Sequence, residues 1–363
     1  ILKGRVDGLE AKVGELEATQ FSTTTKLKGY TTWITGVSKS GRIWDENEEE
    51  YVNSEAVTIN YDLALNFLTS FNGTDLLTAT LRAGNFGSSI FGNELTYLET
   101  AASSQGKIKV DRLNYSFEIN EQLSVSIGPV ISSDDPSMHA GYASYYSADI
   151  LDFFTYGGSV TTVNLDTGSG VGFVYRIPNS GFKVSGNYVS ENGLNSSDGI
   201  GTRQSISTSA WQVFFEQEVL KGNLLGQLGY AYSQNAPLNS GTTETTNNRN
   251  NYSISTAWKP YEAGTIPSIS IGYSGSTVQN GPDINSWYVG VQWDAVFTDG
   301  NSFGGAIGSS PYANDFKGNT MWEMFYSAKL NDNITISPAI FRIDEGGSLN
   351  EQFGGVLKTT FIF

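Results

Sequence analysis

The chain contains no cysteine and only one histidine among its 363 residues. The lack of cysteine excludes a disulfide framework and any cysteine-ligated metal site. A single histidine excludes the HExxH motif of zinc proteases, and the chain has neither a P-loop nor a GxSxG nucleophile elbow. We therefore expect no catalytic site, no metal site and no cofactor.

Charged residues are also scarce, at 16% of the chain against about 25% in an average soluble domain. The net charge of -16 argues against a nucleic-acid partner. No apolar run reaches the roughly 20 residues that a membrane helix needs. Instead the chain has 13% aromatic residues and 41 glycines. Little charge combined with many aromatic residues is typical of a transmembrane β-barrel and unlike a disordered chain.

From Lys26 onward, apolar and polar residues alternate, which predicts half-buried strands. The clearest segment is 55–67, in which one face carries Val57, Ile59, Tyr61, Leu63, Leu65 and Phe67. Sixteen such segments recur, each about ten residues long, as a tilted membrane strand requires. They lie at 26–38, 55–67, 75–86, 108–119, 122–131, 170–178, 181–190, 209–219, 222–234, 250–259, 267–277, 285–297, 301–310, 320–330, 333–343 and 353–363.

The connections between these segments alternate in length. Tight turns with Gly, Asn or Asp, such as 71–73 and 299–301, alternate with long polar loops. Outer-membrane barrels place short turns in the periplasm and long loops outside. We predict an all-β fold, a 16-stranded antiparallel transmembrane β-barrel over 26–363, with both chain ends on the periplasmic side. A soluble β-sandwich or propeller is the alternative, but neither explains the alternation of loops.

The charged residues test the barrel prediction independently, because those within the strands fall almost entirely on the face opposite the apolar one. Lys109, Asp111 and Arg342 break this phase, and we expect them at strand ends among lipid headgroups. A charge at the membrane midplane on the lipid face would cost about 2–4 kcal/mol for Arg or Lys. The polar face therefore predicts a lumen, with a candidate pore wall of Arg82, Arg112, Arg176, Lys183, Lys329 and Lys358.

The longest loop, 132–169, is too apolar to extend into water, so we predict that it folds into the lumen and narrows it. Charged groups at such a constriction select permeants by sign and size. Its candidate constriction residues are Asp134, Asp135, Tyr142, Tyr145, Tyr146, Asp149 and Asp152. Each aspartate could instead simply cap a turn. For His139, in the same loop, we expect a solvated side chain rather than a metal ligand.

A second acidic cluster, 45–50, lies in the first long loop. It predicts a solvated loop tip. The alternatives are a rim that concentrates cations or a divalent-cation bridge to lipopolysaccharide, although no EF-hand spacing is present.

Residues 1–20 carry apolar residues spaced alternately four and three apart, which is the seam of a coiled coil. The seam residues are Leu2, Val6, Leu9, Val13 and Leu16. Because so short a helix is marginal alone in water, the seam predicts a self-associating stalk, as a dimer or as a trimer imposed by the barrel. The alternative is an amphipathic helix packed on its own domain. Residues 21–25 are expected to form a polar linker, and the abrupt start predicts a preceding segment.

The seam followed by LKGYTTWITG, the strand pair EAVTINYDLALNFLTSFNGTDLLTATLRAGNF and the terminal TTFIF resemble cyanobacterial outer-membrane porins of the carbohydrate-selective porin (OprB) type. The resemblance covers essentially the whole chain. It implies a sixteen-stranded barrel, a homotrimer and passive diffusion of small solutes, with family members passing sugars or inorganic ions, including iron. It also implies that Phe361 and Phe363 form a recognition signal for the assembly machinery. A cell-wall-binding surface-layer-homology domain, typical of the family, is absent from this chain.

Three functions remain open from the sequence. The first is a passive diffusion channel, the second a carbohydrate-selective channel that stacks sugars on loop aromatics, and the third a structural tether between outer membrane and cell wall. The expected partners are outer-membrane lipid and lipopolysaccharide, further copies of the chain, small solutes and ions, and peptidoglycan or another cell-wall polymer through a preceding domain.

Overall fold

The computed structural model describes residues 24–39, 41–45, 50–54, 56–92, 96–147, 149–163, 166–236, 247–281, 283–310, 320–344 and 352–363. The predicted coiled-coil stalk, residues 1–20, lies outside the described residues, as does most of the linker. No helix in the described ranges is long and apolar enough to cross a membrane.

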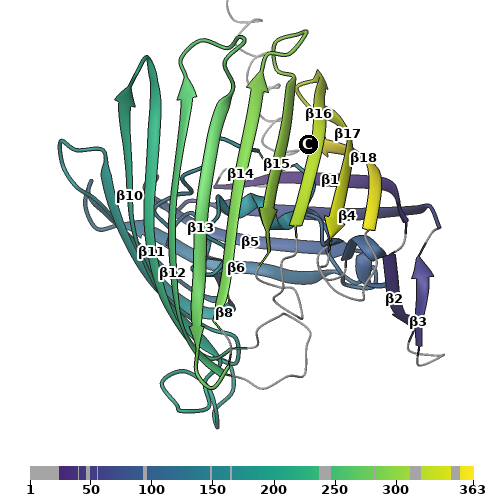
Figure 1. Ribbon diagram of the computed structural model, residues 1–363. Coiled ribbons are helices and arrows are strands. Elements are labelled where there is room, and N and C mark those ends of the chain that lie inside the picture. Colours follow the sequence, from purple (N-terminus) through teal and green to yellow (C-terminus); the bar gives the residue numbers. More distant parts are fainter. Residues whose placement is uncertain are drawn as a thin grey trace, which may run out of the picture.

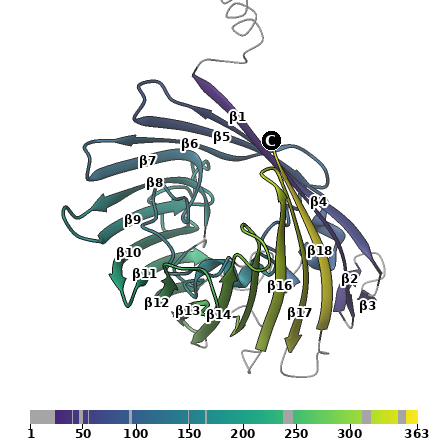
Figure 2. The ribbon, with the colours of Figure 1, turned by 90° about the horizontal axis from the view of Figure 1, so that it is seen from above.

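Sixteen antiparallel strands close into one barrel, which confirms the predicted fold class (Figures 1 and 2). Each strand pairs with its sequence neighbours, apart from a hairpin inserted after β1, and β1 pairs with β18 to close the ring. The barrel strands are β1 (Thr25–Lys39), β4 (Thr58–Thr69), β5 (Asp75–Gly84), β6 (Lys109–Glu118), β7 (Leu123–Ser132), β8 (Thr167–Arg176), β9 (Phe182–Ser190), β10 (Ser207–Val219), β11 (Gly222–Ala236), β12 (Asn247–Pro260), β13 (Ser268–Val278), β14 (Ile284–Asp294), β15 (Ser302–Ser309), β16 (Thr320–Asn331), β17 (Ile334–Asp344) and β18 (Gln352–Ile362).

The two faces of the barrel differ in chemistry, as the alternation predicts. On β13, Ile269, Ile271 and Tyr273 point outward and are 40–48% exposed, while the intervening Ser270 and Ser274 are buried on the inner side. The same pattern of apolar outward and polar inward residues recurs around the ring. A closed barrel satisfies every ladder hydrogen bond without a free edge, so an apolar exterior can lie directly in lipid. The protein is therefore an outer-membrane barrel.

The first long loop contains a structure that the sequence did not predict. Strands β2 (Gly41–Asp45) and β3 (Glu50–Ser54) pair as a two-stranded antiparallel hairpin that projects beside the barrel (Figure 1). The expectation of a solvated loop tip for the acidic cluster 45–50 stays a prediction. The central part of the acidic run, 46–49, lies outside the described residues.

The last strand closes the barrel against the first. The backbones of Gly29 and Phe363 exchange two hydrogen bonds, of 2.7 and 2.9 Å, and the Phe363 ring lies over Gly29. A Cβ at position 29 would sit 2.4 Å from that ring, so a larger residue there would displace the ring. Two residues before the end, Phe361 packs diagonally across the two strands against Trp33, with ring centroids 5.0 Å apart. The terminal aromatics thus cover the seam where the ring closes.

Replacing Phe363 by Ser should therefore slow or reduce barrel assembly more than it changes the conductance of channels that do assemble. The fraction of heat-modifiable, folded protein in the membrane measures assembly. The matched control is Phe353→Ser, because Phe353 lies on the same strand and is 50% exposed against 59% for Phe363. Equal folded fractions for the two variants would contradict a special role for the closing residue.

Candidate functional site: a constriction inside the barrel

The long loop between β7 and β8 lies inside the barrel, against the inner faces of most strands (Figure 2). It leaves the wall at Ser133 and crosses β10, where the Ala140 N–H donates to Gln212 Oε1 at 2.9 Å. It then crosses β13, β14 and β16, and returns across β11 and β12. The side chains that bind it on these strands include Gln227, Ser253, Ser270, Tyr288, Gln292 and Glu323.

Small residues on the wall let the loop lie flat against it. At five inward-facing glycines, a Cβ atom would come within 2.4–2.9 Å of a loop atom. The tightest is Gly272 on β13, where the Cβ would meet the backbone of Gly157 and Gly158. The five are Gly172, Gly229, Gly272, Gly290 and Gly308. Close backbone approach of this kind is what glycine permits, so these positions form the track on which the loop rests.

A second loop also folds inward, which the sequence did not predict. Residues 85–107, between β5 and β6, contain the short 3-10 turns η1 (Phe86–Ser88) and η2 (Ile90–Gly92). Phe91 is fully buried on the inner wall, where its ring meets Phe341 of β17 at 6.2 Å and fills the space over Gly36 of β1. The two inward loops also pair with each other through the bridge Leu98–Leu151.

Together, the two loops and one side of the wall enclose a hydrophobic core inside the barrel. Its largest fully buried members are Phe86, Phe91, Phe154, Tyr288, Phe325 and Phe341. Three of them belong to the wall: Tyr288 on β14, Phe325 on β16 and Phe341 on β17. Their side chains face inward, where the wall of a water-filled lumen would carry polar side chains. The core therefore occupies one side of the lumen, and any aqueous path must run beside it.

An ionic latch holds the two loops to the wall. Lys358 of β18, 8% exposed at its side chain, contacts Glu99 of the second long loop at 3.2 Å and Asp149 of the third at 2.9 Å. Its ammonium group also donates to the Asp149 carbonyl at 2.8 Å. Nearby, the buried Glu323 carboxylate accepts from the Tyr146 hydroxyl and the Leu151 N–H, both at 2.7 Å. Each charge carried into this dry region thus has a partner.

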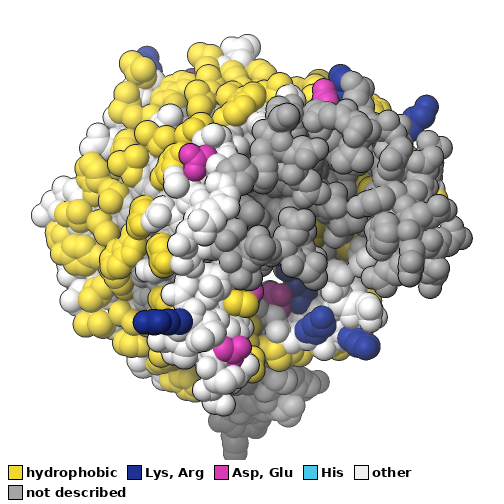
Figure 3. Space-filling model, turned by 60° about the horizontal axis from the view of Figure 1, so that its bottom comes forward, with side chains coloured by type: hydrophobic (Ala, Val, Ile, Leu, Met, Phe, Trp, Pro, Cys, Tyr) yellow, Lys and Arg dark blue, Asp and Glu magenta, His cyan; other side chains and the backbone are white. Residues whose placement is uncertain are grey.

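On β4, β5 and β6, next to β1, ion pairs extend between strands and loop. Arg82 donates through Nε to Asp62 at 2.9 Å, and its guanidinium lies 3.9 Å from Asp111. Arg112 lies 3.5 Å from Asp111 and 4.0 Å from Asp134 of the inward loop. Except for the fully buried Asp62, these side chains are 23–30% exposed, so they line open space. A hollow with acidic and basic side chains at its edge is visible in the space-filling view (Figure 3).

Asp111 reaches this cluster because β6 is irregular. The register with β5 shifts between the pairs Thr80–Arg112 and Leu81–Val110, which leaves Asp111 as an extra residue. A β-bulge of this kind re-aims side chains, and here it turns Asp111 toward Arg82 and Arg112. The expectation that Asp111 lies among lipid headgroups is therefore wrong. Its break in the alternation was the sign of a bulge.

Asp152 lies on the inward loop at the start of the 3-10 turn η4 (Asp152–Tyr156). The Tyr156 hydroxyl donates to its carboxylate, at 2.9 and 3.0 Å from the two oxygens. The carboxyl is partly exposed by surface area, but protein surrounds it on most sides. This desolvation, together with the charges of Glu99 and Asp134, raises its pKa to about 7, against the Tyr156 hydrogen bond and the charge of Arg82, which lower it. Asp152 is thus only partly ionised at neutral pH.

His139 is buried, which contradicts the expectation of a solvated side chain. It is 7% exposed, its Nε2 lies 3.0 Å from the Gln212 amide nitrogen, and its ring stacks near Tyr142 at 4.6 Å. Burial lowers its pKa to about 4, so it is neutral at physiological pH. Within the described part of the chain, no group of three His, Asp or Glu side chains is arranged to hold a metal ion.

The other residues predicted for the constriction loop and the pore wall have different surroundings. Asp135 accepts from Ser137 within a local turn, as a capping aspartate does. Tyr146 is 5% exposed and belongs to the core, so it does not line the lumen. The ring of Tyr145 lies beneath the Lys259 ammonium at 5.8 Å. Three wall cations make local contacts away from the two arginines: Arg176 with Ser124, Lys183 with the Phe214 ring and Lys329 with Asp332.

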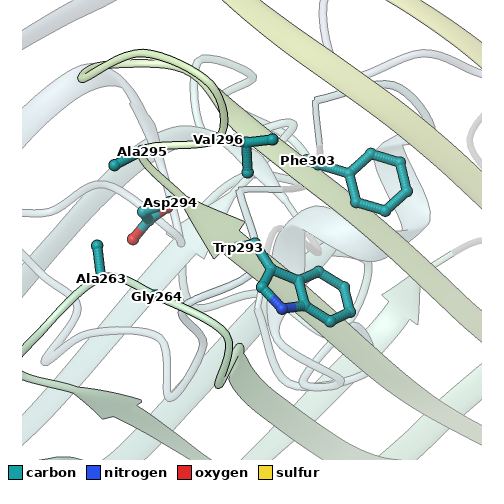
Figure 4. A pocket seen from close by; sticks show the side chains of 7 residues that line it. All are labelled: Ala263, Gly264, Trp293, Asp294, Ala295, Val296 and Phe303. Carbon is teal, nitrogen blue, oxygen red and sulfur yellow. The ribbon is translucent and has the colours of Figure 1, made fainter.

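A separate hollow of about 390 Å³ lies between the two turns that follow β12 and β14 (Figure 4). Trp293 and Phe303, which line it, form a cross-strand pair with ring centroids 5.9 Å apart. They follow the outward phase of their strands, so this hollow belongs to the outer surface and not to the lumen.

Comparison with solved structures shows that this is the porin fold. The chain superposes on OprB of Pseudomonas putida with a TM-score of 0.65 and 11% identity, covering 96% of each chain. An anion-selective porin from Comamonas acidovorans gives a TM-score of 0.60 at 12% identity, covering 94% of this chain and 99% of that one. A loop-deletion mutant of OmpT, an outer membrane protein of Vibrio cholerae, gives 0.57 at 11% identity, covering 94% and 99%. Likeness at this level of identity establishes the fold alone.

Two curated proteins match along nearly the whole chain. The uncharacterized protein alr4550 of Nostoc sp. is 26% identical over 421 residues, covering 100% of this chain and 69% of that protein. The uncharacterized protein sll0772 of Synechocystis sp. is 26% identical over 408 residues, covering 99% and 72%. No family model matches the chain.

Replacing Lys358 by Met should loosen both loops, because Glu99 and Asp149 would lose their shared cation. Breaking a buried ion pair typically costs about 3–5 kcal/mol. We expect faster protease cleavage within 96–102 and 149–156 in folded protein. The matched control is Lys329→Met, because the Lys329 pair with Asp332 is at the surface, with Asp332 94% exposed. Equal cleavage rates in the two variants would contradict the latch.

Proposed function

We propose that the protein is a passive diffusion channel for small hydrophilic solutes and inorganic ions in the outer membrane. The observation that carries the proposal is the pair of inward loops. They are fixed to one side of a closed barrel by a hydrophobic core and an ionic latch. They leave partly exposed ionisable side chains beside the core, from Arg82 and Arg112 on the wall to Asp134 and Asp152 on the loop.

The hydrophobic core covers the inner faces of β1 and β14–β18, and the polar loop contacts on β9–β14 hold the longer loop to the wall. The inward loops also contact β4 and β6, at Asp62 and Arg112. The ion-paired residues on β4, β5 and β6 stay partly open to solvent. Charged side chains at a constriction favour solutes that keep their hydration shell over apolar ones.

Three more specific proposals concern the identity of the permeant, the oligomeric state and a tether to the cell wall. Iron among the permeant ions, and a homotrimer as the functional unit, follow only from the family resemblance. A carbohydrate-selective channel would need exposed aromatic faces. Tyr146 is buried in the core, so stacking would fall to Tyr145, whose ring also meets Lys259, and to Tyr97, 37% exposed. A tether to the cell wall rests on residues 1–20, outside the described residues, together with a preceding domain.

Purified protein in a planar bilayer should give stepwise ion conductance, and steps in groups of three would support the trimer.

Tyr142→Ala should raise the conductance of each step, because this ring lies beside Asp134 and Asp152 at the narrow part. The matched control is Tyr230→Ala, an outward-facing residue that is 47% exposed. A silent bilayer would contradict the channel. Equal conductance in the two variants would contradict this placement of the constriction.

A further inference from the structure

We propose that the constriction prefers cations to anions, and that Glu99 and Asp152 are the residues that set this preference. This inference names the class of permeant for the proposed channel and so rests on the proposed function. It follows from a comparison of the lumen carboxylates that have a cation as partner with those that do not.

The ionisable groups of the constriction form one connected set. Lys358 contacts Glu99 and Asp149, and Asp152 lies within electrostatic range of Glu99, Asp134 and Arg82. Arg82 and Arg112 join this set to the barrel wall. Among the described residues it contains six carboxylates against three cations, a formal excess of three negative charges: Asp62, Glu99, Asp111, Asp134, Asp149 and Asp152 against Arg82, Arg112 and Lys358.

The three cations are all engaged by acids. Arg82 binds the fully buried Asp62 through two nitrogens and also lies near Asp111. Arg112 lies between Asp111 and Asp134, and Lys358 between Asp149 and Glu99. Such pairs present little net positive field to a passing anion, because each positive charge has at least one negative charge within 4.0 Å.

Two carboxylates, Glu99 and Asp152, have negative charge that no nearby cation fully neutralises. Glu99 shares Lys358 with the closer Asp149, and the Glu99 side chain is the most exposed of the three, at 39%. Asp152 forms no ion pair with any Lys or Arg in the described ranges, and Tyr156 is a neutral donor. These two side chains come from the two different inward loops, which pair at Leu98–Leu151 directly beside them. The paired loops therefore present an acidic edge.

Four further wall cations have partners of their own. Lys259 pairs with Asp294 at 2.6 Å and Lys329 with Asp332 at 2.8 Å, both where their strands meet the short turns. Lys183 and Arg176 make local contacts on neighbouring β9 and β8. Screening over about 8–10 Å in physiological salt limits the effect of such distant charges on the constriction.

The preference should depend on pH through Asp152. A carboxyl that titrates near pH 7 is charged above that pH and neutral below it. The facing groups are Glu99, Asp134, Arg82 and the Tyr156 hydroxyl. Glu191 also titrates near 7, next to Asp166 at the end of the inward loop, so an Asp152 variant is needed to separate the two contributions.

The test is the reversal potential of the wild-type channel in a planar bilayer under a tenfold gradient of KCl. At pH 8 we expect a permeability ratio of potassium to chloride above one. Glu99→Gln and Asp152→Asn should each lower that ratio by about two- to threefold, since one unit charge several ångströms from an ion in water is worth about RT. Between pH 8 and pH 6 the wild-type ratio should fall, and in Asp152→Asn it should stay nearly constant.

The matched control is Asp332→Asn, which removes an acid that is 94% exposed at a short turn. It should leave the ratio unchanged. An open wild-type channel with a ratio of one or below would overturn the inference while leaving the proposed channel intact. So would variants of Glu99 and Asp152 that keep the wild-type ratio. Absence of any conductance would instead refute the proposed function.

Discussion

The structure depends on a single constraint, which is that two loops must leave water and lie inside the barrel, where the charges that hold them need partners. A sixteen-stranded ring encloses more space than its own side chains fill. The loops fill part of that space with a hydrophobic core, but they also bring in Asp149 and the backbone around Leu151. On the wall, Lys358 pairs with Asp149, and Glu323 accepts a hydrogen bond from the Leu151 N–H. An unpaired charge there would cost several kcal/mol, so the latch fixes where the loops can lie.

The position of the loops then determines the chemistry of the remaining space. Because the core lies on β1 and β14–β18, the ion pairs of β4, β5 and β6 face the opening. Glu99 and Asp152 reach the opening from the loop side. The charges on β4, β5 and β6 are thus neutralised in ion pairs. The loop edge that carries Glu99 and Asp152 keeps negative charge without an equal number of cations. Fold and selectivity follow from the same packing.

Much of the fold could be predicted from the sequence because a membrane strand leaves a strong period-two signal. The segment 55–67 alternates without a break, and the structure has β4 at Thr58–Thr69. The inserted hairpin β2–β3 carried no such alternation. Asp111 shows the limit of the method, since a one-residue bulge shifts the phase, and a charge out of phase can indicate either a headgroup or a bulge.

The site was harder to predict. The apolar content of 132–169 indicated a loop that folds inward, but not which of its residues would be core and which lumen. Tyr146 lies in the core and Asp152 is partly exposed, although both are loop residues next to aromatics. The second inward loop could have been suspected from Phe86, Ile90 and Phe91, which are costly in water. The glycine track, which includes Gly272 and Gly290, was a further signal, because inward glycines on consecutive strands indicate a close backbone neighbour.

The central claim is that the loop lies fixed against the wall while the channel remains open, and a disulfide tests it directly in a chain that has no native cysteine. The hydroxyl oxygens of Ser159 on the loop and Ser255 on β12 lie 3.5 Å apart. With both residues changed to Cys, we predict nearly complete cross-linking under mild oxidation and single-channel conductance equal to that of the reduced form. The control pair, Ser159→Cys with Ser337→Cys on β17, should not cross-link. Failure of the first pair to form a disulfide, or loss of conductance when it forms, would contradict the account.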